Sequence, residues 1–118
     1  MHNYKELKIW QRAMEYAEEI YKLTALLPVD EKFGLISQIR RSSIAVASNI
    51  AEGCGRHTDK QLHQFLSVAL GSLCEIDTQI LLCERLNILS HSQVDKLNQE
   101  NNELQKMVYS FMKSLNQS

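Results

Sequence analysis

The chain has 118 residues, of which 44% are hydrophobic, and a formal net charge of −1 at pH 7. This length predicts a single domain, over residues 1–118, that buries a hydrophobic core. The near-neutral charge excludes a protein whose overall field attracts nucleic acid or an anionic membrane surface, so any basic site must be local.

The N-terminal segment and the cysteines point to a cellular compartment. The segment MHNYKELKIW contains no apolar signal core, and no apolar run approaches the roughly 20 residues that span a bilayer. Cys54, Cys74 and Cys83 match no metal-ligand spacing and are expected to be reduced thiols. We therefore expect a cytoplasmic protein with no membrane partner and no bound metal.

The first helix is predicted over residues 4–27. Asn3-Tyr-Lys-Glu6 has the spacing of an N-cap with its return glutamate, and Pro28 cannot continue a helix. Apolar residues in this range fall on one helical stripe, which predicts the buried side: Leu7, Trp10, Met14, Ala17, Tyr21 and Leu27.

Three further helices are expected, over residues 31–54, 59–87 and 91–115. Asp30 is a candidate cap for the second helix, which ends at Gly53-Cys54-Gly55. Thr58-Asp-Lys-Gln61 and Ser90-His-Ser-Gln93 are capping boxes that begin the third and the fourth helix. The fourth helix repeats apolar residues with one polar interruption: Val94, Leu97, Asn101, Leu104, Val108, Phe111 and Leu115.

These elements predict an all-α fold. The connections between the helices are short, so neighbouring helices are expected to be antiparallel, in an up-down-up-down four-helix bundle. No sustained alternation of apolar and polar residues bounded by turns supports a strand.

The second helix has two distinct sides when its residues are placed at about 100° each. Its core side carries Leu35, Ile36, Ile39, Ser43, Val46, Ala47, Ile50 and Cys54. The opposite side is polar and is interleaved with Ala45. Together with Glu75 of the next helix, its polar residues form what we call the polar seam: Gln38, Arg41, Ser48, Asn49, Glu52, Arg56 and Glu75.

The third helix is apolar or small-sided all round. Its core side carries Leu62, Phe65, Leu66, Ala69, Leu73, Ile76, Ile80 and Cys83. A helix of this kind is normally buried on both sides. Gly71 in its interior costs about 1 kcal/mol relative to Ala, which close approach by another helix would offset. We therefore predict a homo-oligomer that assembles through an outer face, defined as Ile44, Leu70, Gly71, Cys74, Thr78, Leu81 and Leu82.

Residue patterns typical of catalysis do not occur in the sequence. No glutamate is followed by a histidine three residues later, so the di-iron motif of four-helix bundles is missing. Gly53-Cys54-Gly55 follows a helix rather than a strand and indicates a helix end, not a phosphate loop. No Ser/His/acid or Cys/His set has a spacing that indicates nucleophilic catalysis. We predict no enzymatic activity, no cofactor and no small-molecule substrate.

Five segments carry a family likeness: Gln38-Ile-Arg40-Arg41, Ser48-Asn-Ile-Ala-Glu-Gly53, Gly55-Arg56, Phe65-Leu66 and Ala69-Leu-Gly-Ser-Leu-Cys-Glu75. They resemble the 23S rRNA intervening-sequence proteins, a bacterial family of four-helix bundles. Residues 4–10 and 86–89 look like the flanking segments of the same family, so the likeness covers residues 4–112. Cys54 differs from the family, whose members commonly carry an aromatic residue at that position.

The resemblance implies a left-handed up-down-up-down bundle that assembles as a ring, typically a homopentamer. It also implies a gene that is often found inside intervening sequences of large-subunit ribosomal RNA genes. The family is similar to the accessory variability protein of diversity-generating retroelements, a basic pentameric barrel that works with a reverse transcriptase and binds nucleic acid.

Two hypotheses for the function follow. In the first, an oligomer associates with RNA or DNA through Arg40, Arg41 and Arg56, which a ring would repeat around its axis. In the second, the protein is a scaffold whose polar seam serves subunit or partner contacts without nucleic acid. The second predicts that Arg41 or Arg56 pairs with Glu52 or Glu75. Guanidinium groups open to solvent favour the first hypothesis, and guanidinium groups engaged in pairs favour the second.

Overall fold

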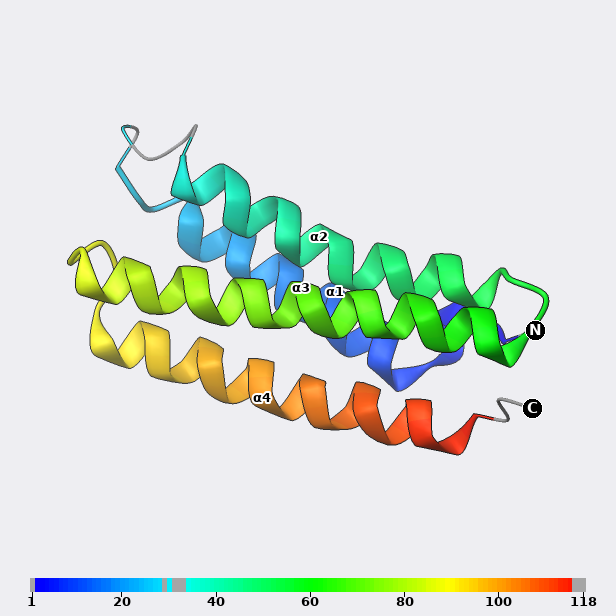
Figure 1. Cartoon of the computed structure of the whole chain (residues 1–118). Coiled ribbons are helices and arrows are strands. Elements are labelled where there is room, and N and C mark those ends of the chain that lie inside the picture. Colours follow the sequence, from blue (N-terminus) through cyan, green and yellow to red (C-terminus); the bar gives the residue numbers. More distant parts are fainter. Residues whose placement is uncertain (1, 29, 31–33, 116–118) are drawn as a thin grey trace.

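The computed structural model describes residues 2–28, 30 and 34–115, and over these residues the chain is helical, with no strand. The bundle measures 47 × 22 × 20 Å and is shown in Figure 1. Its elements are one short 3-10 helix, η1 (Tyr4–Glu6), and four α-helices, α1 (Lys8–Thr24), α2 (Leu35–Cys54), α3 (Asp59–Arg85) and α4 (His91–Ser114). The prediction of an all-α protein with four helices is confirmed.

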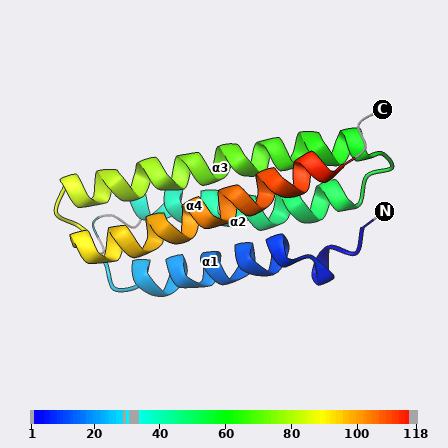
Figure 2. The ribbon, with the colours of Figure 1, turned by 90° about the horizontal axis from the view of Figure 1, so that it is seen from below.

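The four helices close around one core. Each helix contacts its neighbour in the chain, and α4 also contacts α1. The contact between α2 and α3 is the most extensive of these. The start of η1 and the end of α4 lie at the same end of the bundle (Figures 1 and 2). One side of the bundle is therefore formed by α2 and α3, and the opposite side by α1 and α4.

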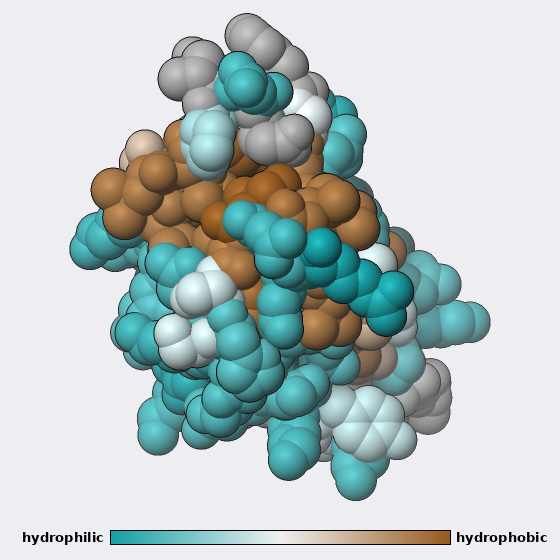
Figure 3. All heavy atoms as spheres, turned by 90° about the vertical axis from the view of Figure 1, so that its left-hand side faces the viewer, coloured by the Kyte–Doolittle hydropathy of each residue, from teal (hydrophilic) through white to brown (hydrophobic). Residues whose placement is uncertain are grey.

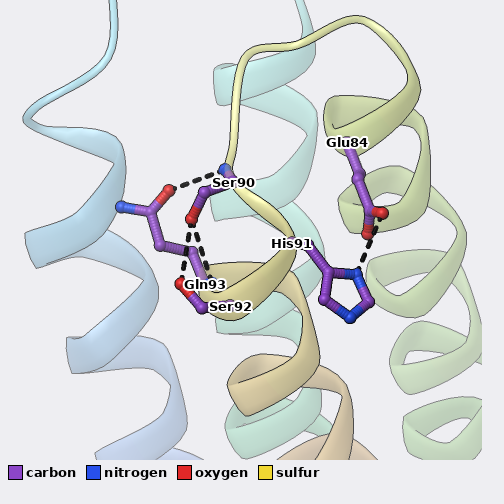
Figure 4. Close-up of polar contacts among 5 residues, drawn as sticks. All are labelled: Glu84, Ser90, His91, Ser92 and Gln93. Carbon is purple, nitrogen blue, oxygen red and sulfur yellow. Dashed lines mark hydrogen bonds and ion pairs between the residues drawn. The ribbon is translucent and has the colours of Figure 1, made fainter.

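The third and fourth helices begin at the caps that the sequence predicts. The Gln61 amide donates to the Thr58 hydroxyl at 3.1 Å, while the Gln61 side chain accepts from the His57 amide at 3.3 Å. Ser90 and Gln93 form a complete capping box (Figure 4), in which the Gln93 amide donates to Ser90 Oγ at 3.2 Å and the Ser90 amide donates to Gln93 Oε1 at 2.9 Å. These bonds satisfy amides that have no partner within the first turn of a helix.

The first helix differs from its prediction at both ends. Asn3 caps η1 rather than α1, because its side chain accepts from the Lys5 amide at 3.3 Å and the backbone is extended at Leu7. The α-helix therefore begins at Lys8 and not at residue 4. It ends at Thr24 rather than 27, since the Leu27 amide bonds the carbonyl of residue 24, three positions back, in a tightened last turn.

The second helix ends at Cys54 as predicted, but Gly55 has φ −82° and ψ −4°, so no left-handed glycine ends it. Its described start is Leu35, after Gly34, which makes no side-chain cap bond. The predicted start at residue 31 lies outside the described residues.

The buried side of α1 is not the stripe predicted from its apolar residues. Met14 and Tyr21 are 39% and 38% exposed, and Leu7, Trp10, Ala17 and Leu27 are only half-buried. The buried residues are instead Ile9, Ala13, Tyr16, Ile20 and Thr24. The physical reason is that Tyr16 and Thr24 find hydrogen-bond partners in the core, so their polar atoms can be buried at little cost.

The core sides of the other three helices are largely as predicted. Of the residues assigned to them, only Leu35, Phe65, Phe111 and Leu115 are half-buried rather than buried. Ser42, Gly53, Ser72 and Met112 are buried as well.

A buried polar network centred on Asn101 joins α1, α3 and α4. The Asn101 side-chain amide donates to the Tyr16 hydroxyl at 3.1 Å and to the Leu73 carbonyl at 2.9 Å. Tyr16 donates to the Leu97 carbonyl at 3.1 Å, and Gln105 donates to Asn101 Oδ1 at 2.6 Å. Burial raises the pKa of Tyr16 well above its ordinary value, so the hydroxyl remains a donor. A shift of α4 would leave a fully buried amide unpaired, at a cost of about 1–3 kcal/mol.

Gly53 sets how closely α2 approaches α3. A Cβ atom at this position would lie 2.8 Å from Leu62 Cδ1 and 2.8 Å from Phe65 Cβ, closer than carbon atoms approach without a shift of one helix. Glycine is therefore required here by the space between two helices and not by its backbone angles.

We predict that Gly53→Ala lowers the free energy of unfolding by about 1–3 kcal/mol, because the added methyl group overpacks the contact between α2 and α3. Gly55→Ala is the matched control, since its Cβ would lie 3.4 Å from the Glu52 carbonyl oxygen and 3.9 Å from the Ala51 carbonyl oxygen, which are ordinary contact distances. Urea denaturation followed by circular dichroism measures both variants. Equal stabilities for Gly53→Ala and the wild type would contradict this account of the contact.

Candidate functional site

The predicted outer face of α2 and α3 is solvent-accessible within one protomer. Three of its large apolar residues are nearly half exposed, with Ile44 at 48%, Leu81 at 45% and Leu82 at 44%. Gly71, Cys74 and Thr78 are exposed and Leu70 is half-buried. Apolar residues on a protein surface are ordinary when scattered singly, but a contiguous group of them marks an interaction site.

The apolar surface extends beyond the residues that the sequence indicated. Val68, three residues before Gly71 on α3, is 53% exposed, and Leu86, just after α3, is 55% exposed. Figure 3 shows apolar residues gathered at the end of the bundle where α1 and α3 end and α4 begins. Leu26, just beyond α1, is 80% exposed. Val68 lies three residues from Gly71, and this helical spacing could have predicted that both lie on the same face of α3. Leu26 and Leu86 come after the ends of helices, so no periodic pattern predicts their exposure.

The middle of the outer face is hollow. A shallow depression of about 300 Å³ is lined by Gly71, Cys74, Glu75, Thr78 and Gln79. A Cβ atom added at Gly71 would meet no heavy atom within 4 Å, so no element of the same protomer explains this glycine. The side-chain oxygen of Gln79 is buried and accepts no hydrogen bond within the described part of the chain. A buried acceptor without a donor is costly, and Gln79 is one of the residues that line the depression.

The polar seam is partly paired within the protomer. Arg56 donates to Glu52 at 2.9 Å and lies 4.8 Å above the Phe65 ring, so the expected pairing of Arg56 with Glu52 is confirmed. Asn49 donates to the Ala45 carbonyl at 2.8 Å. The side chains of the other members of the seam are exposed and form no hydrogen bond or ion pair among residues 2–28, 30 and 34–115: Gln38, Arg41, Ser48 and Glu75.

The structure does not support Arg40 as an anion-binding residue. Its Nε donates to the Thr24 hydroxyl at 2.8 Å, and its terminal nitrogen donates to the Tyr21 carbonyl at 3.3 Å. The guanidinium also lies 4.5 Å from the centre of the Tyr21 ring. Arg40 thus ties α2 to the end of α1. The adjacent Arg41 is exposed and unengaged, which leaves one open guanidinium group of the three that were predicted to meet an anion.

Two further properties bear on partners. By length and composition alone, α3 is apolar enough to cross a membrane, contrary to the prediction that no apolar run reaches that length. A core helix of a soluble protein passes the same test, and 33% of the most apolar window of α3 is buried against the other helices.

Within the described residues, no three histidine, cysteine, aspartate or glutamate side chains group as a metal site.

Comparison with known proteins agrees with the fold and with the family likeness. A family model described as 23S rRNA-intervening sequence protein matches residues 5–110. No curated protein matches the chain. A 1.70 Å crystal structure of a protein of unknown function, from the S23 ribosomal protein family of Bacteroides thetaiotaomicron, is similar in fold, with a TM-score of 0.83 and 23% identity. The similarity covers 90% of this chain and 99% of that chain.

We predict that Arg40→Met lowers the free energy of unfolding by about 1–3 kcal/mol, because it removes two charge-assisted hydrogen bonds and a cation–π contact. Arg41→Met, one residue away, removes a guanidinium group that has no partner in the described part of the chain and changes stability by less than about 1 kcal/mol. Urea denaturation of both variants at one protomer concentration measures the difference. Equal losses would show that the contacts of Arg40 with α1 do not stabilise the bundle.

Proposed function

Because the chain belongs to the 23S rRNA-intervening sequence protein family, we propose that it works as a non-enzymatic homo-oligomeric scaffold, assembled through the outer face of α2 and α3. The observation that carries this proposal is the set of exposed apolar residues on α2 and α3, namely Ile44, Leu81 and Leu82, together with the open space at Gly71. The number of subunits is taken from the family likeness, which favours a pentamer. The proposal includes a cytoplasmic location, in keeping with three free cysteines.

The proposal includes an up-down-up-down, left-handed arrangement of the helices. The connection between α3 and α4 is short, and consecutive helices contact one another along the bundle. A ring of such bundles needs each protomer to offer two different surfaces, because an odd number of subunits cannot meet through one self-complementary patch. The outer face is one of these two surfaces.

A neighbouring subunit would account for several features of the outer face. It would bury the exposed apolar side chains, which is the main favourable term in association. It would fill the depression at Gly71. Arg41 and Glu75, whose side chains have no partner among the described residues, would be available for ion pairs between subunits. The small residues Ala45 and Ser48 would allow another helix to come close.

Association with nucleic acid is the second candidate, and Arg41 is the observation that favours it. A ring would repeat this open guanidinium group around its axis, and such groups bind phosphate. The engagement of Arg40 with α1 and of Arg56 with Glu52 counts against it. A subunit with a net charge of −1 also supplies few phosphate contacts. We therefore place the scaffold first.

We predict that Leu82→Glu converts the oligomer to smaller species, because an ionised carboxylate buried in an apolar interface is costly. Tyr109→Glu is the matched control, since Tyr109 is 56% exposed on α4, on the other side of the bundle. Sedimentation velocity or native mass measurement gives the mass, and circular dichroism verifies that each variant is folded. A monomeric wild-type protein, or an unchanged mass for Leu82→Glu, would contradict the proposal.

For the second candidate, the intact oligomer is titrated with structured RNA and with duplex DNA at low and at moderate salt. If nucleic acid binds at the seam, Arg41→Met weakens the affinity and reduces the salt dependence by about one ion per subunit in contact. Arg85→Met, which removes an exposed arginine at the far end of α3, is the control. Absence of salt-sensitive binding by the wild type would exclude nucleic-acid association and leave the scaffold.

A further inference from the structure

A groove between α1 and α4 lies on the side of the bundle opposite the outer face. The two helices lie side by side (Figure 2) and contact each other directly. The groove has a volume of about 370 Å³ and is lined by Arg12, Glu15, Tyr16, Glu19, Glu100, Glu103 and Leu104. Four carboxyl groups from two helices therefore face one small space, which neither hypothesis for the function uses.

Two of these carboxyl groups interact directly. Glu100 of α4 and Glu19 of α1 line the groove together, with their side chains within hydrogen-bonding reach of each other. Glu19 Oε2 is buried, and no nitrogen or hydroxyl donor of the described residues reaches it. Because an ionised carboxylate only accepts hydrogen bonds, a bond between two carboxyl groups requires a proton on one of them. The same proton supplies the donor that the buried oxygen lacks.

The charged groups around Glu19 and Glu100 do not remove the need for a proton on one of the two carboxyl groups. Arg12 is engaged with Glu103 at 3.1 Å and lies 4.0 Å from Glu15. Arg12 and Lys96 both favour the ionised form of Glu100, but burial and the bond with Glu19 outweigh them and raise the pKa of Glu100 from 4.5 to about 7. From α3, Asp77 adds negative charge near Tyr16, at the back of the groove.

We propose that Glu19 and Glu100 form a proton-operated latch between α1 and α4: a shared proton holds the two helices together, and its loss at neutral to alkaline pH loosens their contact and opens the groove. Tyr16 lines the same groove and belongs to the Asn101 network, so opening reaches the buried bonds that join α1 to α4. The latch acts within one protomer and does not depend on assembly through the outer face.

The direction of the pH effect follows from proton binding. The folded protein binds a proton at Glu100 more tightly than the unfolded chain does, because its pKa is about 7 when folded and near 4.5 when exposed. The stabilisation is therefore fully present below about pH 4.5 and is lost as the pH rises through about 7. The shift corresponds to roughly a 300-fold tighter binding of the proton as an upper limit, and solvent in the groove reduces its effect.

We predict that the carboxyl carbon of Glu100, followed by NMR in the wild-type protein, titrates with a midpoint near 7. Amide protons of α1, after correction for the intrinsic rate, exchange about tenfold faster at about pH 8.5 than at about pH 5.5. Glu100→Gln keeps a donor for Glu19 Oε2 at every pH, so protection of α1 in this variant stays constant within about twofold. Glu18→Gln, which removes a carboxylate from the exposed side of α1, is the control and behaves as the wild type.

Three results would overturn the latch. A midpoint near 4.5 for Glu100 would show that no proton is shared. A raised midpoint without faster exchange in α1 would show that the proton has no conformational role. The same pH dependence of exchange in Glu100→Gln as in the wild type would assign the effect to other groups.

Discussion

The side-chain amide of Asn101 is the contact on which the arrangement of the bundle depends, because it is fully buried and bonds groups on two other helices. A buried polar side chain of this kind fixes the register of packed helices, since a shifted register leaves it unpaired. Its bond to the Leu73 carbonyl sets α3 against α4 and keeps Gly71 on the outside. Its bond to Tyr16 sets α1 against α4, which brings Glu100, the preceding residue of α4, beside Glu19.

The two long sides of the bundle consequently have opposite chemistry. On α2 and α3, exposed apolar and small residues accompany a shallow depression, and together they form a surface suited to another protein chain. On α1 and α4, carboxyl groups outnumber the cations that face them, and the contact depends on one proton. The proposed interface and the proposed latch are thus separated in space.

Predictions from the sequence were correct where the physical cause is local. The caps at Thr58 and Ser90 involve residues three positions apart, and the pair of Glu52 with Arg56 spans one helical turn. Predictions failed where the local sequence is compatible with more than one arrangement of the side chains. α1 has apolar residues on two sides, and its apolar pattern selected the side that carries Trp10 and Met14. Arg40 and Arg41 are chemically identical in sequence, yet only Arg40 points back to the end of α1.

The sequence by itself therefore determined the number of helices, the first residues of α3 and α4, most of the core sides of α2 to α4 and the family, since these depend on helical periodicity, capping and motif spacing. Only the tertiary structure decided which side of α1 is buried, which arginine remains open and which glutamates share a proton. Those contacts join residues far apart in the chain, such as Tyr16 and Asn101, which are 85 positions apart. No local spacing encodes such pairs, because they exist only once the packed helices fix one register.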